Sequence, residues 1–247
     1  MLRPDTQKLW THLQSEPALK GFVLVGGTAL AMHLHHRLSE DLDFMYLGKK
    51  LPKGQIDALK RRALDEGFEF MPNDSPAGVE EFINAGLDFG DYQQDYMVNG
   101  TVKVTFVAPE PENARQLEPV ESPGPRIASL AEIFRLKCIV TAERSKTRDW
   151  FDLYLLLQQA HFEPIEFLRA FERAGAPRKY DIAMMRLCSG KPGLDDEGYA
   201  SLLDHPPTLK EMQRFFLGIR DRIEKDAARQ AIEAALKGKP PFNGNPG

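Results

Sequence analysis

Residues 22–47 read FVLVGGTALAMHLHHRLSEDLDFMYL, and this stretch decides the fold of the chain. Four apolar residues lead into a pair of glycines, and a helix-length segment then leads to two aspartates, Asp41 and Asp43, at the start of a second apolar run. Short apolar runs bounded by glycine and polar residues are typical of buried strands. The order predicts a strand, a glycine turn, a helix and a second strand in direct succession.

The glycine turn has the chemistry of a phosphate-binding site. Gly26 and Gly27 carry no side chain that would keep the backbone away from phosphate oxygens. A helix that begins near Thr28 points its unpaired N–H groups and the positive end of its dipole at the same place. We therefore expect these three residues to bind the phosphates of a nucleotide, with Arg37 and Ser39 completing the binding site.

The two aspartates have the chemistry of a metal site. Asp41 and Asp43 are two residues apart on the predicted second strand, so both side chains point to one face of the sheet. Two carboxylates on one face bind Mg²⁺, or Mn²⁺ in its place, because these ions prefer oxygen ligands, some of them from substrate phosphates. Such ions can clamp the attacking and leaving oxygens of a phosphoryl or nucleotidyl transfer. A glycine pair or an aspartate pair alone is often without function, so it is their succession that favours a catalytic site.

Bulk composition places the chain among ordinary globular proteins. Its 247 residues suffice for one large domain or two smaller ones, and 42% hydrophobic with 28% charged residues is a usual balance. The net charge of −4 gives no global reason to expect nucleic-acid binding, so contact with RNA needs a local basic patch. Cys138 and Cys188 lie in apolar helical patterns, which indicates buried free thiols in a reducing compartment. We see no signal-peptide pattern and no apolar run of membrane length, so we expect a cytoplasmic protein without a membrane partner.

A proline-rich segment divides the remaining chain. Residues 111–127 combine several prolines with acidic residues, which is typical of a linker. We expect a sheet-containing core at 1–110, a helical domain at 128–240 and a flexible tail at 241–247. Hydrophobic periodicity and capping signals predict helices at 5–15, 53–67, 129–144, 148–160, 163–174, 178–188, 195–203 and 208–237, and a short strand at 68–70.

The dipeptide Asn99-Gly100 predicts a β-hairpin. It is a favoured two-residue turn, and the residues on either side of it alternate between apolar and polar. Lys103 and Thr105 then share a polar face, where Lys103 can contact a phosphate. The expected strands are 92–98 and 101–107, and the tight register pairs Val98 with Thr101, Tyr96 with Lys103 and Gln94 with Thr105.

Two blocks of the sequence resemble a known family. GGTALAMHLHHRLSEDLDF at 26–44 resembles the signature of the AbiEii/AbiGii nucleotidyltransferase toxins, which belong to the polymerase-beta-like nucleotidyltransferase superfamily. KTRDWFDLY at 146–154 resembles the later K-x-R-D-x-x-D-L-Y segment of that family, and the likeness covers about residues 20 to 160. The resemblance implies an α/β fold, with a nucleotidyltransferase-like mixed sheet, flanking helices and a helical C-terminal half.

The resemblance also implies a function. It suggests an enzyme that uses Mg²⁺ to move NMP from an NTP onto an RNA acceptor, with tRNA among the candidates, or onto a protein acceptor. It further suggests a toxin of a toxin–antitoxin or phage-defence system that has a cognate antitoxin. The residues do not choose between RNA and protein, and they give neither the preferred base nor the oligomeric state.

Three residues of the helical half belong to the expected site. The family likeness favours a basic residue such as Lys137 at the nucleotide phosphates, although a lysine on a half-exposed helix also simply extends toward water. Arg148 is expected to pair with Asp41, with Asp43 or with a phosphate. Asp149 is expected to organise the catalytic site, although an acid in a first helical turn also complements the helix dipole.

One position departs from the superfamily pattern. Members commonly carry a third carboxylate on a strand after the aspartate pair, and Thr105 stands where that acid would be expected. Without it, the group that deprotonates the acceptor hydroxyl is undefined. Because of this departure, a nucleotide-binding module without catalytic activity stays an alternative function. The aspartate pair by itself would also suit a metal-dependent phosphohydrolase, but the glycine turn fits triphosphate binding by a nucleotidyltransferase better. The acids that could replace the missing one are Asp88, Asp91, Asp95, Asp149 and Asp152.

The histidines His33, His35 and His36 invite a metal interpretation. His33 and His36 are three residues apart in the predicted helix and therefore share a face. No cysteine or clear third ligand accompanies them in the sequence, so we interpret them as surface or packing histidines.

Overall fold

A mixed β-sheet organises the N-terminal half of the chain. The computed structural model describes residues 2–159, 162–203 and 205–237. Within these residues the sheet has six strands in the order β3-β4-β5-β2-β1-β6, with β1 antiparallel to β2 and β2 parallel to β5. This arrangement confirms the expected mixed sheet, although the short strand expected at 68–70 lies two residues further along. The strands are β1 Phe22–Val25, β2 Leu42–Tyr46, β3 Phe70–Pro72, β4 Gln93–Val98, β5 Val102–Val107 and β6 Arg126–Ile127.

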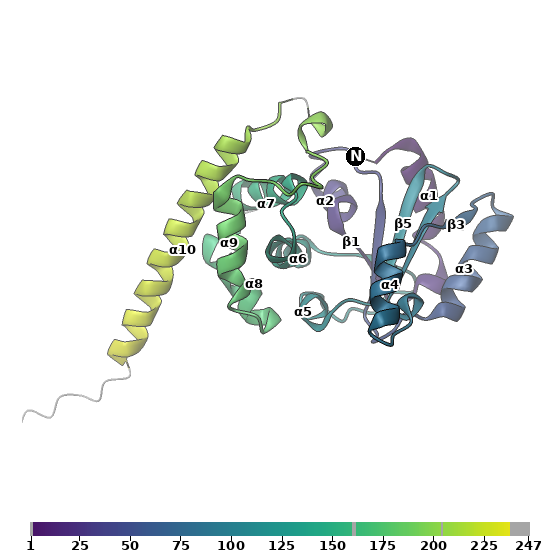
Figure 1. Cartoon of the computed structure of the whole chain (residues 1–247), viewed down its shortest axis with the longest axis horizontal. Helices are drawn as coiled ribbons and strands as arrows, with labels where there is room; N and C mark the ends of the chain where they lie inside the picture. Colours follow the sequence, from purple (N-terminus) through teal and green to yellow (C-terminus); the bar gives the residue numbers. More distant parts are fainter. Residues whose placement is uncertain (1, 160–161, 204, 238–247) are drawn as a thin grey trace, which may run out of the picture.

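Helices cover both sides of this sheet, and a helical half follows it. Figure 1 shows α1 and α3 on one side, and α2 and α6 on the side that faces the C-terminal helices. Seven of the eight expected helices are confirmed to within two residues at each end. The helices are α1 Pro4–Leu13, α2 Gly26–Leu34, α3 Lys53–Asp65, α4 Pro76–Asn84, α5 Pro111–Ala114, α6 Leu130–Glu143, α7 Thr147–Gln159, α8 Pro164–Ala174, α9 Lys179–Ser189 and α10 Leu209–Lys237.

The helix expected at 195–203 is wrong. Only Ala200–Leu202 form a short 3₁₀ turn, and Gly198 takes a left-handed φ of 75°. The side chain of Asp196 instead accepts hydrogen bonds from the backbone N–H and the hydroxyl of Thr147, at 2.9 and 2.7 Å. Because such side-chain bonds compete with helix formation, the acidic segment becomes a loop held against the start of α7.

The hairpin is present, but its expected register is wrong by one residue. Three residues rather than two link β4 to β5, and Asn99 and Gly100 take left-handed φ values of 49° and 68°. The extra residue lets Tyr96 and Val98 join the apolar face of the partner strand, whereas the tight register would have set them opposite polar residues. The observed pairs include Val98 with Val102, Met97 with Lys103, Tyr96 with Val104 and Asp95 with Thr105.

The apolar face of the sheet packs against α1 and α3. Phe44 of β2 and Phe106 of β5 are fully buried, and their ring centroids lie 5.5 Å apart. Trp10 of α1 stacks on Phe44 at 6.4 Å, and α3 buries Ile56 in the same core. Because successive side chains alternate across a strand, burial of this face turns Asp43 of β2 toward the opposite side.

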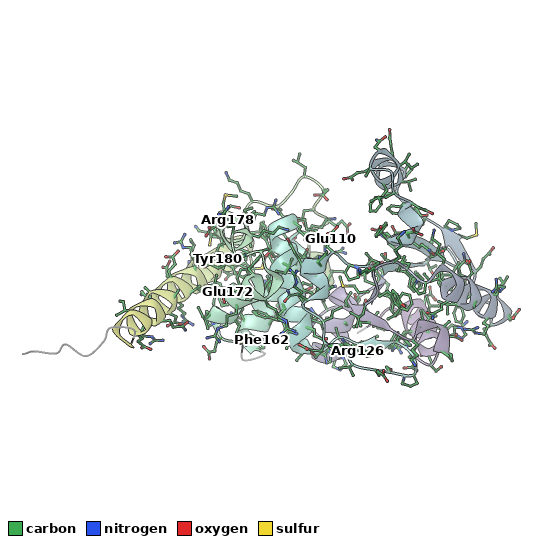
Figure 2. All side chains as sticks on the ribbon, turned by 90° about the horizontal axis from the view of Figure 1, so that it is seen from below. Glu110, Arg126, Phe162, Glu172, Arg178 and Tyr180 are labelled. Carbon is green, nitrogen blue, oxygen red and sulfur yellow. The ribbon has the colours of Figure 1, made fainter. Side chains whose placement is uncertain are left out.

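The strand β6 connects the sheet to the helical half. It lies inside the segment expected to be a linker, and it pairs in parallel with β1 as an edge strand. Arg126 of β6 forms an ion pair with Glu132 of α6 at 2.7 Å, and Figure 2 shows Arg126 at the junction of the two halves. Ser129 and Glu132 form the expected capping box of α6. The domain boundaries themselves stay a prediction.

Both cysteines are free thiols, as expected. Cys138 is buried, and burial raises the pKa of its thiol well above the ordinary value, whereas Cys188 is only half-buried. Among the helices that the structure describes, none is long and apolar enough to cross a membrane. The tail expected to be flexible, 241–247, lies outside the described residues.

Candidate active site

The strand β1 ends at the glycine turn, and β2 brings Asp43 beside it, whereas Asp41, expected on the same strand, lies in the loop one residue before β2. Val25, the last residue of β1, pairs with Asp43 of β2, and Gly26 follows directly. Gly26 has a φ of 73°, and a Cβ atom at this position would lie 2.8 Å from Oδ2 of Asp43. A glycine is therefore needed both for the left-handed backbone and for the space beside the carboxylate.

Gly27 makes room for a second side chain of the site. A Cβ atom here would overlap Nη2 of Arg37 and come within 3.1 Å of its Cζ atom. Arg37 is buried, and its Nε and Nη2 atoms donate to the two carboxylate oxygens of Asp152 at 3.0 and 3.1 Å. The glycine pair thus accommodates side chains of the site itself, in addition to the backbone approach that the sequence predicts.

The first turn of α2 is tied to the loop that carries Asp41. The hydroxyl of Thr28 donates to the backbone carbonyl of Asp41 and lies 2.7 Å from the hydroxyl of Ser39. Thr28 and Ser39 are both buried. These two residues, expected at the nucleotide, therefore fix the position of the aspartate pair relative to the helix N-terminus.

A cavity of about 230 Å³ opens over these residues. It is lined by every residue expected in the site except Gly26, which lies beside Asp43. Such a concentration of charge suits a polyanion accompanied by a metal ion, and not an apolar ligand. The cations of the lining are Arg37, Lys103, Lys137, Arg144, Lys146 and Arg148, and the acids are Glu40, Asp41, Asp43, Asp149 and Glu197.

The aspartate pair is electrostatically strained. Removal from water, together with the charge of Asp41, raises the pKa of Asp43 to about 6. Removal from water also raises the pKa of Asp41, although Lys103 opposes the shift. A divalent cation between the two carboxylates would offset the desolvation and the mutual repulsion, so this pair of oxygen donors fits Mg²⁺ or Mn²⁺.

Lys137 lies between two buried acids at the cavity. Its Nζ atom is 2.7 Å from Oδ1 of Asp149 and 2.7 Å from Oδ2 of Asp152. Burial alone would lower the pKa of Lys137, but the charges of Asp149 and Asp152 outweigh it and raise the pKa. The lysine is therefore a fixed positive charge, buried and not extended toward water.

Asp149 and Asp152 hold the cations of the site in place. Asp149 accepts hydrogen bonds from Lys137 and, at 2.8 Å, from Nε of Arg144. Asp152 accepts from Arg37 as well as from Lys137. Burial alone would raise the pKa of both carboxyls, but these cations bring both values below the ordinary one. The structure thus gives Asp149 an organising position, through the cations that it holds.

The rim of the cavity also contains Arg144, which the sequence analysis does not name, and Lys146, which it quotes only as the first residue of the block at 146–154. Both lie in the break between α6 and α7, where basic residues are too common to be a signal by themselves. Arg148 pairs with Glu197 at 3.1 Å and not with Asp41 or Asp43, and its Nε atom donates to the carbonyl of Gly198 at 2.9 Å. The only sequence feature that indicates this contact is the run of three acidic residues that ends at Glu197.

One of the acids that could replace the missing third carboxylate lies on the same face of the sheet as Asp43. Thr105 of β5 pairs with Asp43 of β2 on one side and with Asp95 of β4 on the other. The hydroxyl of Thr105 donates to Oδ1 of Asp95 at 2.7 Å. Asp88 and Asp91 instead form ion pairs with surface lysines. Of the acids that could replace the missing carboxylate, Asp95 is therefore the one that the sheet pairs with Thr105.

The histidines occupy packing positions. Nε2 of His36 lies 3.0 Å from Oδ1 of Asp152, and Nε2 of His33 lies 2.8 Å from the carbonyl oxygen of Ala128. His35 ends α2 with a left-handed φ of 50°. In the part of the chain that the structure describes, no three His, Cys, Asp or Glu side chains are arranged to hold a metal.

Fold and site agree with the class of protein that the sequence predicts. A mixed sheet sets a glycine turn and an aspartate pair beside a cluster of cations, as expected for a nucleotidyltransferase. The chain belongs to the AbiEii nucleotidyl transferase toxins of type IV toxin–antitoxin systems, whose family model matches residues 8–244. The protein is thus a transferase of the family that its sequence resembles.

Two solved structures are similar to the chain. JHP933 from Helicobacter pylori shares 21% identity with a TM-score of 0.48, over 96% of this chain and 100% of that one. A protein from H. pylori described as a proposed nucleotidyltransferase shares 23% identity with a TM-score of 0.48, over 90% of this chain and 96% of that one. No curated protein matches the sequence.

Proposed function

We propose that this enzyme moves a nucleoside monophosphate from an NTP onto a hydroxyl of an RNA or protein acceptor, with tRNA among the candidates. One observation carries the proposal: residues from both halves of the chain converge on a single cavity that contains the helix N-terminus, the aspartate pair and six cations. A triphosphate with its metal ion has the charge and the oxygen atoms that this lining would bind.

The N-terminal turn of α2 provides the phosphate cradle. Its first N–H groups, including those of Gly27 and Thr28, have no partner within the helix, and the helix dipole favours an anion there. Lys103 of β5 and Lys137 of α6 approach the same cavity from other elements. These groups would bind phosphate oxygens from different directions and so orient the nucleotide.

Asp41 and Asp43 would hold Mg²⁺, or Mn²⁺ in its place. The ion supplies positive charge that offsets the charge of the phosphates. The protein itself contributes position and electrostatic stabilisation, as in other phosphoryl transfers. Lys137 suits this role because its partners already hold it in place, so no reorganisation is needed when charge develops on the leaving pyrophosphate.

Incubation with each α-³²P-labelled NTP, Mg²⁺, total RNA and soluble protein extract tests the proposal. We expect one labelled RNA or protein band, which would also name the acceptor class. The band should disappear in the variant Asp41→Asn/Asp43→Asn and persist in Asp65→Asn, a matched change on the exposed end of α3. Transfer that survives the loss of both aspartates would show that the site is wrongly assigned.

A second candidate function follows from Thr105. Its hydroxyl stands next to Asp43 where a carboxylate would be expected, so a nucleotide-binding module without turnover has a specific observation in its favour. This candidate predicts that Mg·NTP binds while no acceptor is labelled and no pyrophosphate is released. Release of pyrophosphate with any acceptor eliminates it.

The family also bears on partners and location. Because the family belongs to toxin–antitoxin systems, we propose that a cognate antitoxin counteracts this enzyme. We place its activity in the cytoplasm, where NTPs, Mg²⁺ and both acceptor classes are available. Co-expression with an adjacent antitoxin-like gene should restore growth that the enzyme alone inhibits, and inhibition that persists beside every neighbouring gene would contradict this assignment.

A further inference from the structure

Asp95 is a buried acid without a cationic partner in the described structure. The residue is 5% exposed, and among the described residues its two oxygens accept hydrogen bonds from the hydroxyl of Thr105 and the amide of Gln93 alone, each at 2.7 Å. A buried carboxylate that relies on neutral donors costs folding free energy, so its presence calls for a reason. The other acids that the structure shows as fully buried each pair with arginine or lysine, namely Glu132, Asp149 and Asp152.

The register of the sheet places Asp95 in line with the metal site. Asp43, Thr105 and Asp95 are paired residues on the adjacent strands β2, β5 and β4, so their side chains share one face. Neighbouring strands lie about 4.8 Å apart, which puts Asp95 roughly 10 Å from Asp43, too far for contact. Thr105 lies between them, half-buried, with its hydroxyl already bonded to Asp95.

The acids that line the cavity are all engaged. Asp41 and Asp43 form the proposed metal site, and Asp149 is held by Lys137 and Arg144. The remaining two acids of the lining form ion pairs with arginines, Glu40 with Arg3 and Glu197 with Arg148. A hydroxyl nucleophile must lose its proton during transfer, and each of these acids already has a proposed metal-binding role or a cationic partner.

We propose that Thr105 and Asp95 form a proton relay for the acceptor hydroxyl, an inference that rests on the proposed function. The acceptor oxygen forms its bond to the α-phosphorus while its proton passes to Oγ1 of Thr105. The proton that Thr105 carried passes to Oδ1 of Asp95. The bond from the α-phosphorus to the bridging oxygen breaks, and pyrophosphate leaves with that electron pair. In this relay Thr105 would reach the acceptor hydroxyl from its position beside Asp43, which lines the cavity, and Asp95 would act through Thr105 as a positioning residue.

Isosteric variants test the relay in the full-length enzyme. Thr105→Val removes the hydroxyl and Asp95→Asn removes the basic oxygen, and each should lower kcat by about 10²-fold while KM for the NTP stays within about twofold. Thr105→Ser keeps the hydroxyl and should keep kcat within about threefold. Because both residues serve one relay, the double variant should be no slower than the slower single variant. Thr105→Asp in the Asp95→Asn background should restore transfer, since it places a carboxylate next to Asp43.

Thermal unfolding and Mg·NTP binding of each variant distinguish a relay from a structural contact. If Thr105→Val keeps the wild-type kcat, the relay is wrong, and a lower melting temperature at unchanged kcat would assign Asp95 to stability alone. If Asp95→Asn does not fold, the comparison of Thr105→Val with Thr105→Ser still decides, because both keep the carboxylate. Absence of transfer by the wild-type enzyme would overturn the proposed function and the relay with it, whereas transfer that withstands Thr105→Val overturns only the relay.

Discussion

Replacement of Gly27 by alanine tests how the glycine turn contributes to the site. Gly27 lies in the first turn of α2, where alanine would normally favour the helix. Its Cβ atom would overlap Nη2 of Arg37, which donates to Oδ2 of Asp152 at 3.1 Å. Arginine is flexible enough to move, so the cost lies in the hydrogen bond that its movement breaks and not in the overlap itself.

The magnitude follows from this one bond. A buried hydrogen bond to a charged group contributes about 1.5–3 kcal/mol. The Nε bond of Arg37 to Asp152 can persist, and the gain from replacing glycine in a helix returns about 0.5 kcal/mol. We therefore expect Gly27→Ala to lower the free energy of unfolding by about 1–2.5 kcal/mol, equivalent to about 5 °C in Tm for a chain of this size.

Thermal unfolding followed by circular dichroism measures the effect, and Gly54→Ala provides the matched control. Gly54 lies in the first turn of α3, and a Cβ atom there meets nothing within 4 Å. The control should therefore be neutral or slightly more stable than the wild type. If Gly27→Ala is as stable as Gly54→Ala, the position of Arg37 does not depend on the missing side chain and the reasoning fails.

Three further predictions concern charged residues. Glu197→Gln removes the ion-pair partner of Arg148 at the rim of the cavity and should tighten Mg·NTP binding about two- to fivefold, as measured by calorimetry. The effect is small because the ion pair is largely exposed. The control variant Glu233→Gln, on α10, should leave Mg·NTP binding unchanged. Lys137→Met leaves the buried carboxylates of Asp149 and Asp152 without this cation. It should lower the free energy of unfolding in urea by about 3 kcal/mol and abolish transfer. Wild-type stability of this variant would show that Lys137 does not neutralise the two acids. Burial alone would raise the pKa of Glu132, but bonds from Arg126 and from backbone N–H groups bring it to about 2, below the ordinary 4.5. The unfolded state therefore binds more protons between these values, so stability should fall as pH drops through this window by about 1–2 kcal/mol, with the partial exposure allowed for, and Glu132→Gln should lack that loss.

The parts of the fold that follow from local signals could be predicted from the sequence. The glycine pair and the two aspartates are close in the chain, and the strands on either side have unambiguous apolar runs. The capping box of Ser129 and Glu132 predicts the start of helix α6, and the structure contains this capping box. Each signal acts within a few residues of the element that it specifies, so no tertiary information was required.

The errors occur where a distant contact decides the local structure. The hairpin turn carries a favoured two-residue sequence, yet Asn99 also bonds through its side chain to the backbone of Glu69 and Gly67, which belong to the preceding segment. The loop that contains Asp196 was expected to be helical, but that side chain caps Thr147, far away in sequence. Neither partner can be identified from the chain alone, because register and capping across elements are tertiary properties.

The cations of the site fall into two groups that the sequence does not separate. Lys137 and Arg37 are held by acids that are almost completely buried, so their positions are set before any nucleotide arrives. Lys146 and Arg148 pair with the exposed acids of the loop at 195–197, and a phosphate could replace these partners in water at little cost. The fixed group would orient the nucleotide, and the exchangeable group would contribute affinity. Salt should therefore weaken NTP binding mainly through Lys146 and Arg148, and a salt dependence that is unchanged in the Lys146→Met/Arg148→Met variant would contradict this division.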